Sequence, residues 1–347
     1  MWCANCNKTS YSDVCEVCGG KTQQDTPIEL YWCDSCRVPI IRELSDTSPM
    51  ICPSCGKPIR YLAKDLRPVF PEERLLLEVI KGTPLAFLHS SVWASGSRYY
   101  IDGKTANLSI ETLKKIDVEK VVETLTQYKD KNDYSFFNEN IRTFIDCNRE
   151  RLDSIKNEAT SFVVEQVKRF PNHKLVISFS GGKDSTVVAD IVTRALSDPS
   201  IVHIFGDTTL EFPTTYEYVK RYKKQHYKTP VIPARNRDKD FYELCKLVGP
   251  PSRVMRWCCT VFKTGAITRQ IEKMFRNKSH IVTFYGIRRS ESASRSKYEK
   301  ESDSPKISKQ TVVSPIIDWY DFDVWLYLFT RGIDFNEAYR WGYTRVG

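Results

Sequence analysis

The amino-acid sequence predicts an α/β protein whose main body is a parallel β-sheet with crossover helices. Two observations lead to this fold class. From about residue 151 onward, apolar strand patterns alternate with amphipathic helix patterns, which is the order of a parallel sheet. In front of this body, eight of the twelve cysteines form four Cys-x-x-Cys pairs. We therefore expect a double zinc ribbon over residues 1–60, a small α+β segment over 61–150 and an α/β domain over 151–347.

The composition excludes some classes of protein. The chain has 347 residues, 41% hydrophobic and 27% charged, and this length suits two or three domains. No run of about 18 apolar residues occurs, so no membrane-spanning helix is predicted. The start Met1-Trp2-Cys3 is not a signal peptide, and we expect a cytoplasmic protein. The net charge of +9 suits a nucleotide or nucleic acid as ligand, or solubility alone.

The cysteine pairs have the spacing of metal ligands. Two residues between two thiolates let both sulfurs reach one ion from a tight turn. The two later pairs are separated by 15 residues, as in zinc ribbons, and the two earlier pairs by eight. Without an export signal, metal is favoured over disulfides, and a redox dithiol or an iron site is the alternative. We predict two structural zinc ions, held by Cys3, Cys6, Cys15, Cys18, Cys33, Cys36, Cys52 and Cys55.

Residues 61–150 carry a weaker pattern. The spacing of apolar residues predicts a short amphipathic helix over 72–81, and residues 91–104 alternate like a β-hairpin with a turn at Asp102-Gly103. Two tyrosines in this hairpin are expected to face the core and the surface in turn. The alternative is a contact with nucleic acid, through Arg98, Tyr99, Tyr100 and Lys104.

The α/β body begins with an amphipathic helix over 151–170 and a buried strand over 174–179. Helices and strands then alternate. A segment rich in Ser, Lys and Glu over 290–309 is expected to be a mobile loop. The further predicted helices cover 187–196 and 216–227, and the further strands cover 201–205, 230–233 and 281–285.

The loop after the first strand of this body is the main candidate site. Ser180-Gly-Gly-Lys-Asp-Ser185-Thr186 lies between a strand and a helix, where free backbone N–H groups and the helix dipole favour an anion. Lys183 adds a positive charge. The patterns Gly-x-x-x-x-Gly-Lys and Gly-x-Gly-x-x-Gly are absent, so neither a Walker A site nor a nicotinamide fold is predicted. Taken alone, such a loop is more often a helix N-cap.

Five segments together resemble one known family. The loop Ser180-Gly-Gly-Lys-Asp-Ser185 is similar to the pyrophosphate (PP) loop of the ATP pyrophosphatases, and the other segments resemble their phosphoadenylylsulfate (PAPS) reductase-like branch. They follow the family's order over residues 174–347. The resemblance implies the adenine nucleotide alpha hydrolase-like fold, a parallel sheet with helices on both faces. The other segments are Gly206-Asp-Thr-Thr209, Arg256-Trp-Cys-Cys-Thr-Val-Phe-Lys263, Gly286-Ile-Arg-Arg-Ser-Glu-Ser-Ala-Ser-Arg295 and Pro315-Ile-Ile-Asp-Trp319.

The resemblance also implies roles for single residues. The cationic side chains would stabilise phosphate charge, and Asp184 would contact a Mg²⁺ ion that bridges the phosphates. The strand backbone near Phe179 and Gly286 would contact adenine. The implied catalytic residues are Lys183, Asp184, Arg288 and Arg295, and the implied nucleotide-binding residues are Ser178, Phe179, Ser180, Gly181, Gly182, Lys183, Asp184, Ser185, Thr186, Asp207, Thr208, Gly286 and Arg288.

Two reactions fit the resemblance. ATP pyrophosphatases cleave ATP between the α- and β-phosphates to adenylate an acceptor, whereas PAPS and adenylylsulfate reductases cleave a sulfonucleotide with a thiol. Only ATP brings β- and γ-phosphates to the loop, and the reductases tend to have an eroded loop and a nucleophilic C-terminal cysteine. This chain keeps the loop and has no cysteine after Cys259, so we favour ATP cleavage. A third reading is a nucleic-acid-binding module that only senses ATP.

The adjacent Cys258 and Cys259 are another family feature. In the resembled family such a pair joins a later Cys-x-x-Cys pair in holding a [4Fe–4S] cluster. The sequence ends at Gly347 without that later pair, so we expect a C-terminally truncated chain with part of the cluster site. Cys147 and Cys245 are expected to be small buried residues.

Partners follow from the same resemblance. Similar proteins with zinc ribbons include the ATP pyrophosphatase that works with a cysteine desulfurase in DNA phosphorothioation. This implies a cysteine desulfurase or another sulfur donor protein as partner, and a nucleic acid as acceptor, with DNA favoured over tRNA. The basic, aromatic segment over 220–228 is compatible with DNA binding and equally with a solvated helix face.

Overall fold

The computed structural model of the chain divides into two compact units. None of the described helices is long and apolar enough to cross a lipid bilayer. The N-terminal unit comprises residues 1–153, 320–331 and 340–342, and the C-terminal unit comprises 154–319, 332–339 and 343–347. The structure describes residues 2–3, 6, 8–10, 12, 14–22, 28–252, 254–275, 280–292, 295–304, 307 and 309–346.

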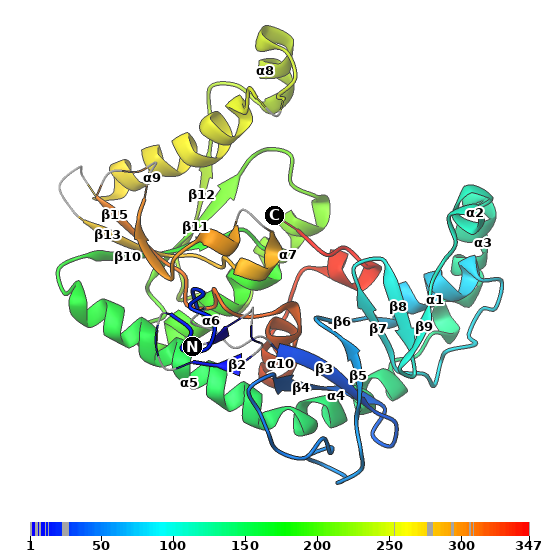
Figure 1. Cartoon of the computed structure of the whole chain (residues 1–347). Helices are drawn as coiled ribbons and strands as arrows, with labels where there is room; N and C mark the ends of the chain where they lie inside the picture. The colour runs from blue at the N-terminus through cyan, green and yellow to red at the C-terminus, as the bar shows by residue number, and fades with distance from the viewer. Residues whose placement is uncertain are drawn as a thin grey trace. The chain divides into compact units, whose positions relative to one another are not determined.

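The C-terminal unit is built on a six-stranded sheet (Figure 1). Its strand order is β12-β11-β10-β13-β15-β14, and every neighbouring pair is parallel except β14 with β15. The prediction of a largely parallel sheet is therefore confirmed. The strands are β10 (Lys174–Phe179), β11 (Val202–Asp207), β12 (Val231–Arg235), β13 (Ile281–Phe284), β14 (Glu301–Asp303) and β15 (Gln310–Val313).

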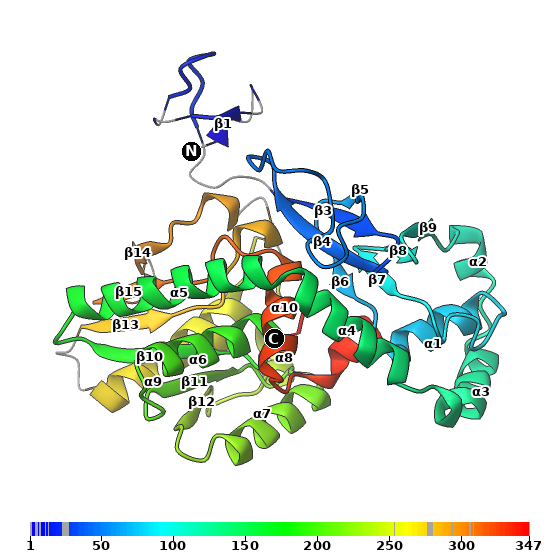
Figure 2. The same ribbon diagram turned by 90° about the horizontal axis from the view of Figure 1, so that it is seen from below.

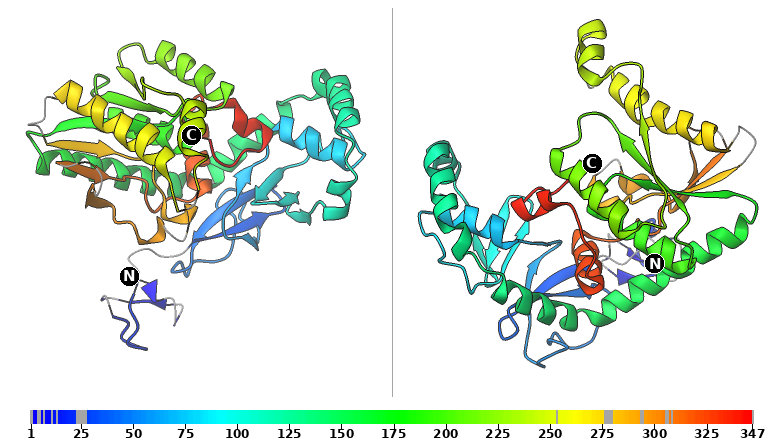
Figure 3. Two further views of the ribbon diagram at one scale, coloured as in Figure 1. Left: turned by 90° about the horizontal axis from the view of Figure 1, so that it is seen from above. Right: turned by 180° about the vertical axis from the view of Figure 1, so that it is seen from behind.

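Helices cover both faces of this sheet, as expected. Seen from below, α5 and α6 lie in front of the strands (Figure 2), and seen from above α9 lies in front of them (Figure 3). Because side chains alternate along β10, Val176 packs with Ala266 and Ile271 of α9. On the other face, the ring of Phe179 lies 4.5 Å from that of Tyr222 on α7. The helices are α5 (Arg149–Arg169), α6 (Lys183–Ala195), α7 (Pro213–Gln225), α8 (Phe241–Val248), the π-helix η2 (Cys259–Thr264), α9 (Gly265–Phe275) and the 3₁₀ turns η3 (Arg289–Glu291) and η4 (Arg295–Lys297).

The segment over 290–309 differs from the loop that the sequence predicts. Residues 301–303 form β14, which pairs antiparallel with β15, so that Asp303 lies opposite Thr311. The prediction of a loop is wrong for these residues. The reason is that β14 stands at the edge of the described sheet, and edge strands tolerate the charged and polar residues that the central strands exclude.

The strand order places the crevice of the sheet between β10 and β13. From β10 the chain moves outward through β11 to β12, and β13 then pairs with the other side of β10. In open parallel sheets, ligands bind at such a point, beside the carboxyl ends of the strands. The loops after β10 and β13 meet there, because a Cβ atom added to Gly286 would lie 2.6 Å from the carbonyl carbon of Asp184.

The N-terminal unit contains small antiparallel sheets, with strand orders β1-β2, β4-β3-β5 and β6-β7-β8-β9. The predicted helix over 72–81 and the predicted hairpin are confirmed, and Asp102 and Gly103, at the turn between β8 and β9, have φ of +49° and +71°. Tyr100 is buried, and the Tyr99 hydroxyl donates to Glu73 Oε1 at 2.9 Å. The elements are β1 (Trp2–Cys3), β2 (Lys8–Thr9), β3 (Ile28–Cys33), β4 (Val38–Glu43), β5 (Arg60–Ala63), β6 (Arg67–Pro68), α1 (Pro71–Ile80), β7 (Val92–Ser95), β8 (Arg98–Ile101), β9 (Lys104–Ala106), α2 (Ile110–Lys114), α3 (Val118–Tyr128), η1 (Lys129–Lys131), α4 (Ser135–Cys147) and α10 (Asp321–Arg331).

A helix from near the end of the sequence completes the core of the N-terminal unit. The Phe144 ring of α4 lies 4.9 Å from Trp93 on β7 and 4.9 Å from Phe322 on α10. The Asp65 carboxylate accepts the N–H groups of Asp321 and Phe322 at 3.0 and 3.1 Å, which caps the first turn of α10. Residues 321–331 therefore belong to this unit although they follow the α/β sheet in sequence.

Candidate functional site

The glycine loop between β10 and α6 is held in one conformation by its own side chains. Gly181 has φ of +74°, which glycine adopts without strain. Ser180 Oγ accepts the N–H of Gly182 at 3.3 Å. Ser185 Oγ accepts the N–H of Ser180 at 3.2 Å and donates to the Gly182 carbonyl at 2.9 Å. Thr186 Oγ1 donates to the same carbonyl at 3.1 Å. The backbone N–H groups of the loop are therefore pre-oriented.

Three charged side chains meet directly behind the loop. Lys183 Nζ lies 3.1 Å from one carboxylate oxygen of Asp184, and Arg288 Nε lies 2.6 Å from the other. Lys183 and Arg288 are only 2% and 4% exposed. Burial would raise the pKa of Asp184, but the charges of Arg288 and Lys183 outweigh it and hold this pKa at about 2. In this charged cluster, the single carboxylate of Asp184 thus lies between two cations.

Two further arginines lie beside the charged cluster. The Glu291 carboxylate accepts a hydrogen bond from Arg295, and the Glu291 carbonyl accepts one from Arg345. Burial lowers the pKa of Arg295, and the charge of Arg345 lowers it further, so the two guanidinium groups are close enough to repel each other. Arg295 is thus bonded to Glu291 in the loop after β13, whereas Arg345 was not predicted from the sequence because no motif marks it.

A tyrosine from the C-terminal part of the chain covers the loop. The Tyr339 hydroxyl, in η5 (Glu337–Trp341), accepts the backbone N–H of Lys183 at 3.0 Å. Its ring centre lies 5.4 Å from Lys183 Nζ. A Cβ atom on Gly182 would lie 2.5 Å from the Val346 carbonyl oxygen, so only glycine fits there. The Asn336 amide donates to Thr215 Oγ1 at 3.0 Å, which fixes this segment to α7. Sequence reasoning also missed Tyr339.

The residues at and directly after the end of β11 form a second turn. Asp207 Oδ1 accepts the Tyr216 hydroxyl at 2.7 Å and the Thr209 N–H at 2.9 Å. Thr208 Oγ1 donates to Glu211 at 2.7 Å. Thr209 has φ of +67°, a strained conformation for a β-branched residue, and its buried hydroxyl has no hydrogen-bond partner among the described residues. Asp207 thus connects this turn to α7 through Tyr216 and to β12 through Arg235, whose Nη1 lies 3.9 Å from Asp207 Oδ2.

The remaining residues implied by the resemblance lie on the two central strands. Phe179 is buried at the end of β10, and Ser178 beside it is half-buried and faces Tyr285 closely enough to affect the pKa of that phenol. Gly286 follows β13 and packs against the backbone of Asp184. Of the residues implied for nucleotide binding, the structure therefore brings the glycine loop, Gly286 and Arg288 into direct contact.

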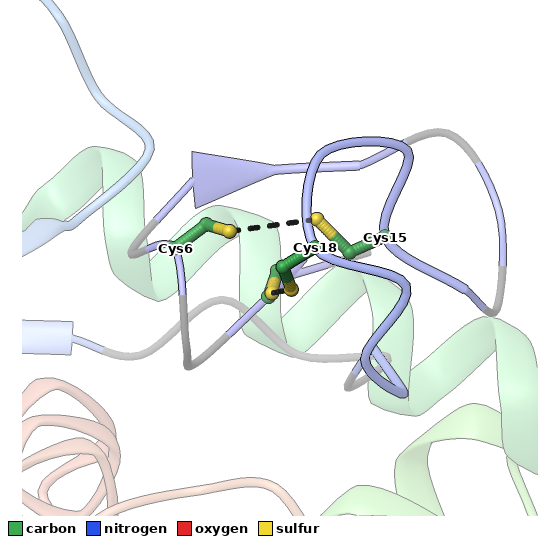
Figure 4. Close-up of side chains that lie close together, drawn as sticks. Cys6, Cys15 and Cys18 are labelled. Carbon is green, nitrogen blue, oxygen red and sulfur yellow. Dashed lines mark hydrogen bonds between the residues drawn. The ribbon is translucent and has the colours of Figure 1, made fainter.

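The first eight cysteines form two groups, each with four sulfurs within 4.8 Å of one another. In the first group, Cys3 and Cys18 sulfurs lie 3.4 Å apart and Cys6 and Cys15 sulfurs 3.8 Å apart (Figure 4). A tetrahedral zinc site with Zn–S bonds of about 2.3 Å has sulfurs about 3.8 Å apart, so these positions fit one ion. In the second group the sulfur distances are 3.5 Å for Cys33 to Cys55 and 3.7 Å for Cys36 to Cys52.

Backbone N–H groups in the turns between the paired cysteines favour thiolates. The N–H of Val17 donates to Cys15 Sγ at 3.4 Å. Backbone hydrogen bonds from Cys18 and Val17 lower the pKa of Cys15 to about 7, and one from Lys57 lowers the pKa of Cys55 to about 6. Each group therefore contains one thiol that ionises easily, as a metal ligand must.

The adjacent Cys258 and Cys259 lie at the start of η2, both partly exposed. Burial raises the pKa of Cys258, and Cys259 raises it further. Arg256 Nη2 lies 3.4 Å from Cys259 Sγ. Across the described ranges, neither cysteine belongs to a group of three or more ligands for a metal ion.

The chain is similar in sequence to several known proteins. Two uncharacterized proteins of Methanocaldococcus jannaschii are 31% identical over 211 residues and 30% identical over 248 residues. The matches cover 60% and 70% of this chain, and the chain spans about half the length of these curated relatives, 49% and 50%. The adenosine 5'-phosphosulfate reductase of Anoxybacillus flavithermus is 30% identical over 180 residues, 50% of this chain and 70% of that protein.

Among solved structures, a phosphoadenylyl-sulfate (PAPS) reductase from Candida auris in a phosphate complex is 16% identical, with a TM-score of 0.42, over 58% of this chain and 95% of that one. Residues 174–347 match the family described as phosphoadenosine phosphosulfate reductase domain. That range holds the glycine loop, the charged cluster and both adjacent cysteines. The chain belongs to the phosphoadenosine phosphosulfate reductase domain family.

Proposed function

We propose that the chain is an ATP pyrophosphatase, which cleaves ATP between the α- and β-phosphates to activate an acceptor for sulfur transfer. The observation that carries this proposal is the complete glycine loop from Ser180 to Thr186, because only ATP brings β- and γ-phosphates to it. Behind the loop, the buried cations Lys183 and Arg288 lie on the two oxygens of one carboxylate. A phosphate group on the loop would lie beside these two cations.

The loop residues supply what the departing pyrophosphate needs. Its negative charge grows as the α–β bond breaks, and pre-oriented N–H groups and fixed cations stabilise charge that develops in a transition state. Lys183 and Arg288 would approach phosphate oxygens, and Arg295 would approach from the loop after β13. The N–H of Lys183 would exchange its bond with the Tyr339 hydroxyl for one with a phosphate oxygen.

Asp184 is better suited to positioning than to binding Mg²⁺. Each of its carboxylate oxygens already accepts from a cation, Lys183 Nζ or Arg288 Nε. A magnesium ion at Asp184 would compete with these cations for the same carboxylate. We therefore propose that Asp184 holds Lys183 and Arg288 in place, and that Mg²⁺, which would neutralise the phosphates, binds through the nucleotide.

The second candidate is reductive cleavage of an adenylylsulfate by a thiol. The observation in its favour is the family itself, together with relatives that are named adenosine 5'-phosphosulfate reductases. Cys258 and Cys259 would then hold part of a [4Fe–4S] cluster. Both reactions need an anion site at the glycine loop, so the cluster of charges alone does not separate them.

Further parts of the proposal rest on the resemblance. Both cysteine groups would hold structural Zn²⁺, supported by their tetrahedral sulfur distances. A DNA backbone phosphate would be the sulfur acceptor, ahead of tRNA, and a cysteine desulfurase or similar protein the donor. Pyrophosphate release from ATP, measured with DNA, with tRNA and with neither, tests the acceptor.

A ligand panel decides between the two reactions. Isothermal titrations compare ATP, AMP, adenylylsulfate and phosphoadenylylsulfate on the same protein. We expect ATP to bind more tightly than either sulfonucleotide, because only ATP offers a β,γ-pyrophosphate to the loop. Preference for a sulfonucleotide, with thiol-dependent release of sulfite, would establish the reductase instead.

A further inference from the structure

A fifth thiol lies against the second cysteine group. The Sγ atom of Cys147, in the last turn of α4, is 3.9 Å from the Sγ atom of Cys52. Cys147 is 4% exposed and Cys52 is 1% exposed. From the sequence, Cys147 is expected only to be a small buried residue, because 95 positions separate it from Cys52.

The surrounding hydrogen bonds fix this contact. Asn148, next to Cys147, accepts the N–H of Ile41 at 2.9 Å and donates to the Pro39 carbonyl at 3.0 Å. About two turns earlier on α4, the Asn140 amide donates to the Arg37 carbonyl at 2.9 Å. These three acceptors and donors belong to β4 and to the turn directly after Cys36. Helix α4 is therefore held against β4 and the turn that follows Cys36, and its last turn places Cys147 beside Cys52.

A buried thiol beside a zinc-bound thiolate has a defined chemical role. Four thiolates on one Zn²⁺ ion leave a net charge of −2, and hydrogen-bond donors to the sulfurs stabilise that charge. A thiol is a weak donor, and the Sγ atom of Cys147 lies within hydrogen-bonding distance of the Sγ atom of Cys52. A donor also draws electron density from the sulfur, which makes it a weaker nucleophile and a more durable ligand.

We propose that Cys147 is a positioning residue of the second zinc site, whose S–H group donates to the Cys52 thiolate and protects that zinc–sulfur bond. This inference rests on the proposal that the second cysteine group holds Zn²⁺. It assigns Cys147 to the outer surroundings of the ion, not to its four ligands.

The test measures the reactivity of Cys52 itself. Zinc per chain is first counted in the wild type, Cys147→Ala, Cys147→Ser and the control Cys245→Ala. N-ethylmaleimide labelling of Cys52 is then followed over time by peptide mass spectrometry. Because outer partners of metal ligands typically change metal affinity by about 10- to 100-fold, we expect about tenfold faster labelling in Cys147→Ala. Cys147→Ser should be intermediate and Cys245→Ala unchanged.

The outcomes separate this inference from the zinc proposal. A wild type without zinc in the second group would remove the zinc proposal and this inference with it. A zinc-loaded Cys147→Ala protein that labels within twofold of the wild type would overturn the inference alone. If Cys147→Ala does not fold, Cys147→Val, which also lacks a donor, decides by the same limit. A cobalt-substituted Cys55→Ser protein that keeps the charge-transfer intensity of four thiolates would make Cys147 a ligand and also overturn it.

Discussion

Two buried ionic clusters, one in each unit, differ in the number of cations around one carboxylate. In the N-terminal unit, Arg67 donates through both Nη atoms to the two carboxylate oxygens of Glu73, at 2.6 Å each. In the C-terminal unit, Lys183 and Arg288 share the single carboxylate of Asp184. The first cluster is a balanced one-to-one pair, whereas the second places two cations on one carboxylate. The number of cations, rather than burial, therefore distinguishes this structural ion pair from the candidate anion site.

The largest expected effect is loss of the balanced pair. Glu73→Ala removes the partner of Arg67, whose side chain is 8% exposed, and leaves a buried charge without compensation. Breaking such a pair lowers the free energy of unfolding by about 3–5 kcal/mol. Urea unfolding monitored by tryptophan fluorescence measures the loss, with the exposed Glu119→Ala as control. A loss of under about 1 kcal/mol, typical of surface pairs, would contradict the structural role.

His203 extends the comparison to a buried titratable group that is not part of an ion pair. His203 is fully buried, and burial lowers its pKa to about 4, whereas the unfolded value is about 6.5. The folded state thus excludes a proton that the unfolded state binds. The free energy of unfolding should be highest above pH of about 6.5 and should fall by about 3 kcal/mol as the pH is lowered to about 4.

His203→Gln tests this pH dependence. Glutamine does not titrate and can replace the hydrogen bonds to the Ile201 carbonyl and the Tyr222 hydroxyl. The stability of the variant should therefore vary less between pH 7 and 4 than that of the wild type. Asp184, whose pKa is lowered to about 2, begins to lose its contribution only near its unfolded pKa of about 3.9, and this loss is the same in both proteins. Equal slopes in the two proteins would exclude His203 as the source.

The cluster of two cations should respond differently from the one-to-one pair. Lys183→Met removes one of two cations and leaves Asp184 paired with Arg288, so the free energy of unfolding should fall by less than in Glu73→Ala. Binding of ATP should weaken by about 10- to 100-fold, since a charge-assisted contact contributes about 1.5–3 kcal/mol. Titration calorimetry compares the variant with Lys220→Met on the exposed face of α7. A stability loss as large as that of Glu73→Ala would make Lys183 structural.

The smallest expected effect concerns backbone strain at Thr209, in the turn after β11. Thr209→Gly relieves a φ of +67° and removes a buried hydroxyl without a described partner. Because a non-glycine residue in the left-handed region loses about 1–2 kcal/mol, we expect a gain of about 1 kcal/mol in unfolding free energy. Thr208→Gly, in an adjacent position whose φ is not positive, is the control and should lower stability.

Several features followed from local sequence patterns. Strand-to-helix alternation predicted the parallel sheet, and the glycines and Lys183 marked the loop, because backbone geometry there depends on neighbouring residues. The pairs Cys33/Cys36 and Cys52/Cys55 predicted the second sulfur group from spacing alone. In contrast, the polar strand β14 was predicted as a loop. It forms a strand because it pairs with β15, and its own residues do not indicate this.

By itself, the sequence determined the sheet, the glycine loop and the two cysteine groups, since each depends on residues that are close in the chain or belong to a recurring motif. Only the tertiary structure decided which distant residues complete them: Tyr339 and Arg345 at the loop and its neighbours, and Cys147 beside Cys52. These contacts span tens to more than a hundred residues. The hydrophobic periodicity of the sequence does not indicate such pairs, because the packing of whole helices and strands brings them together.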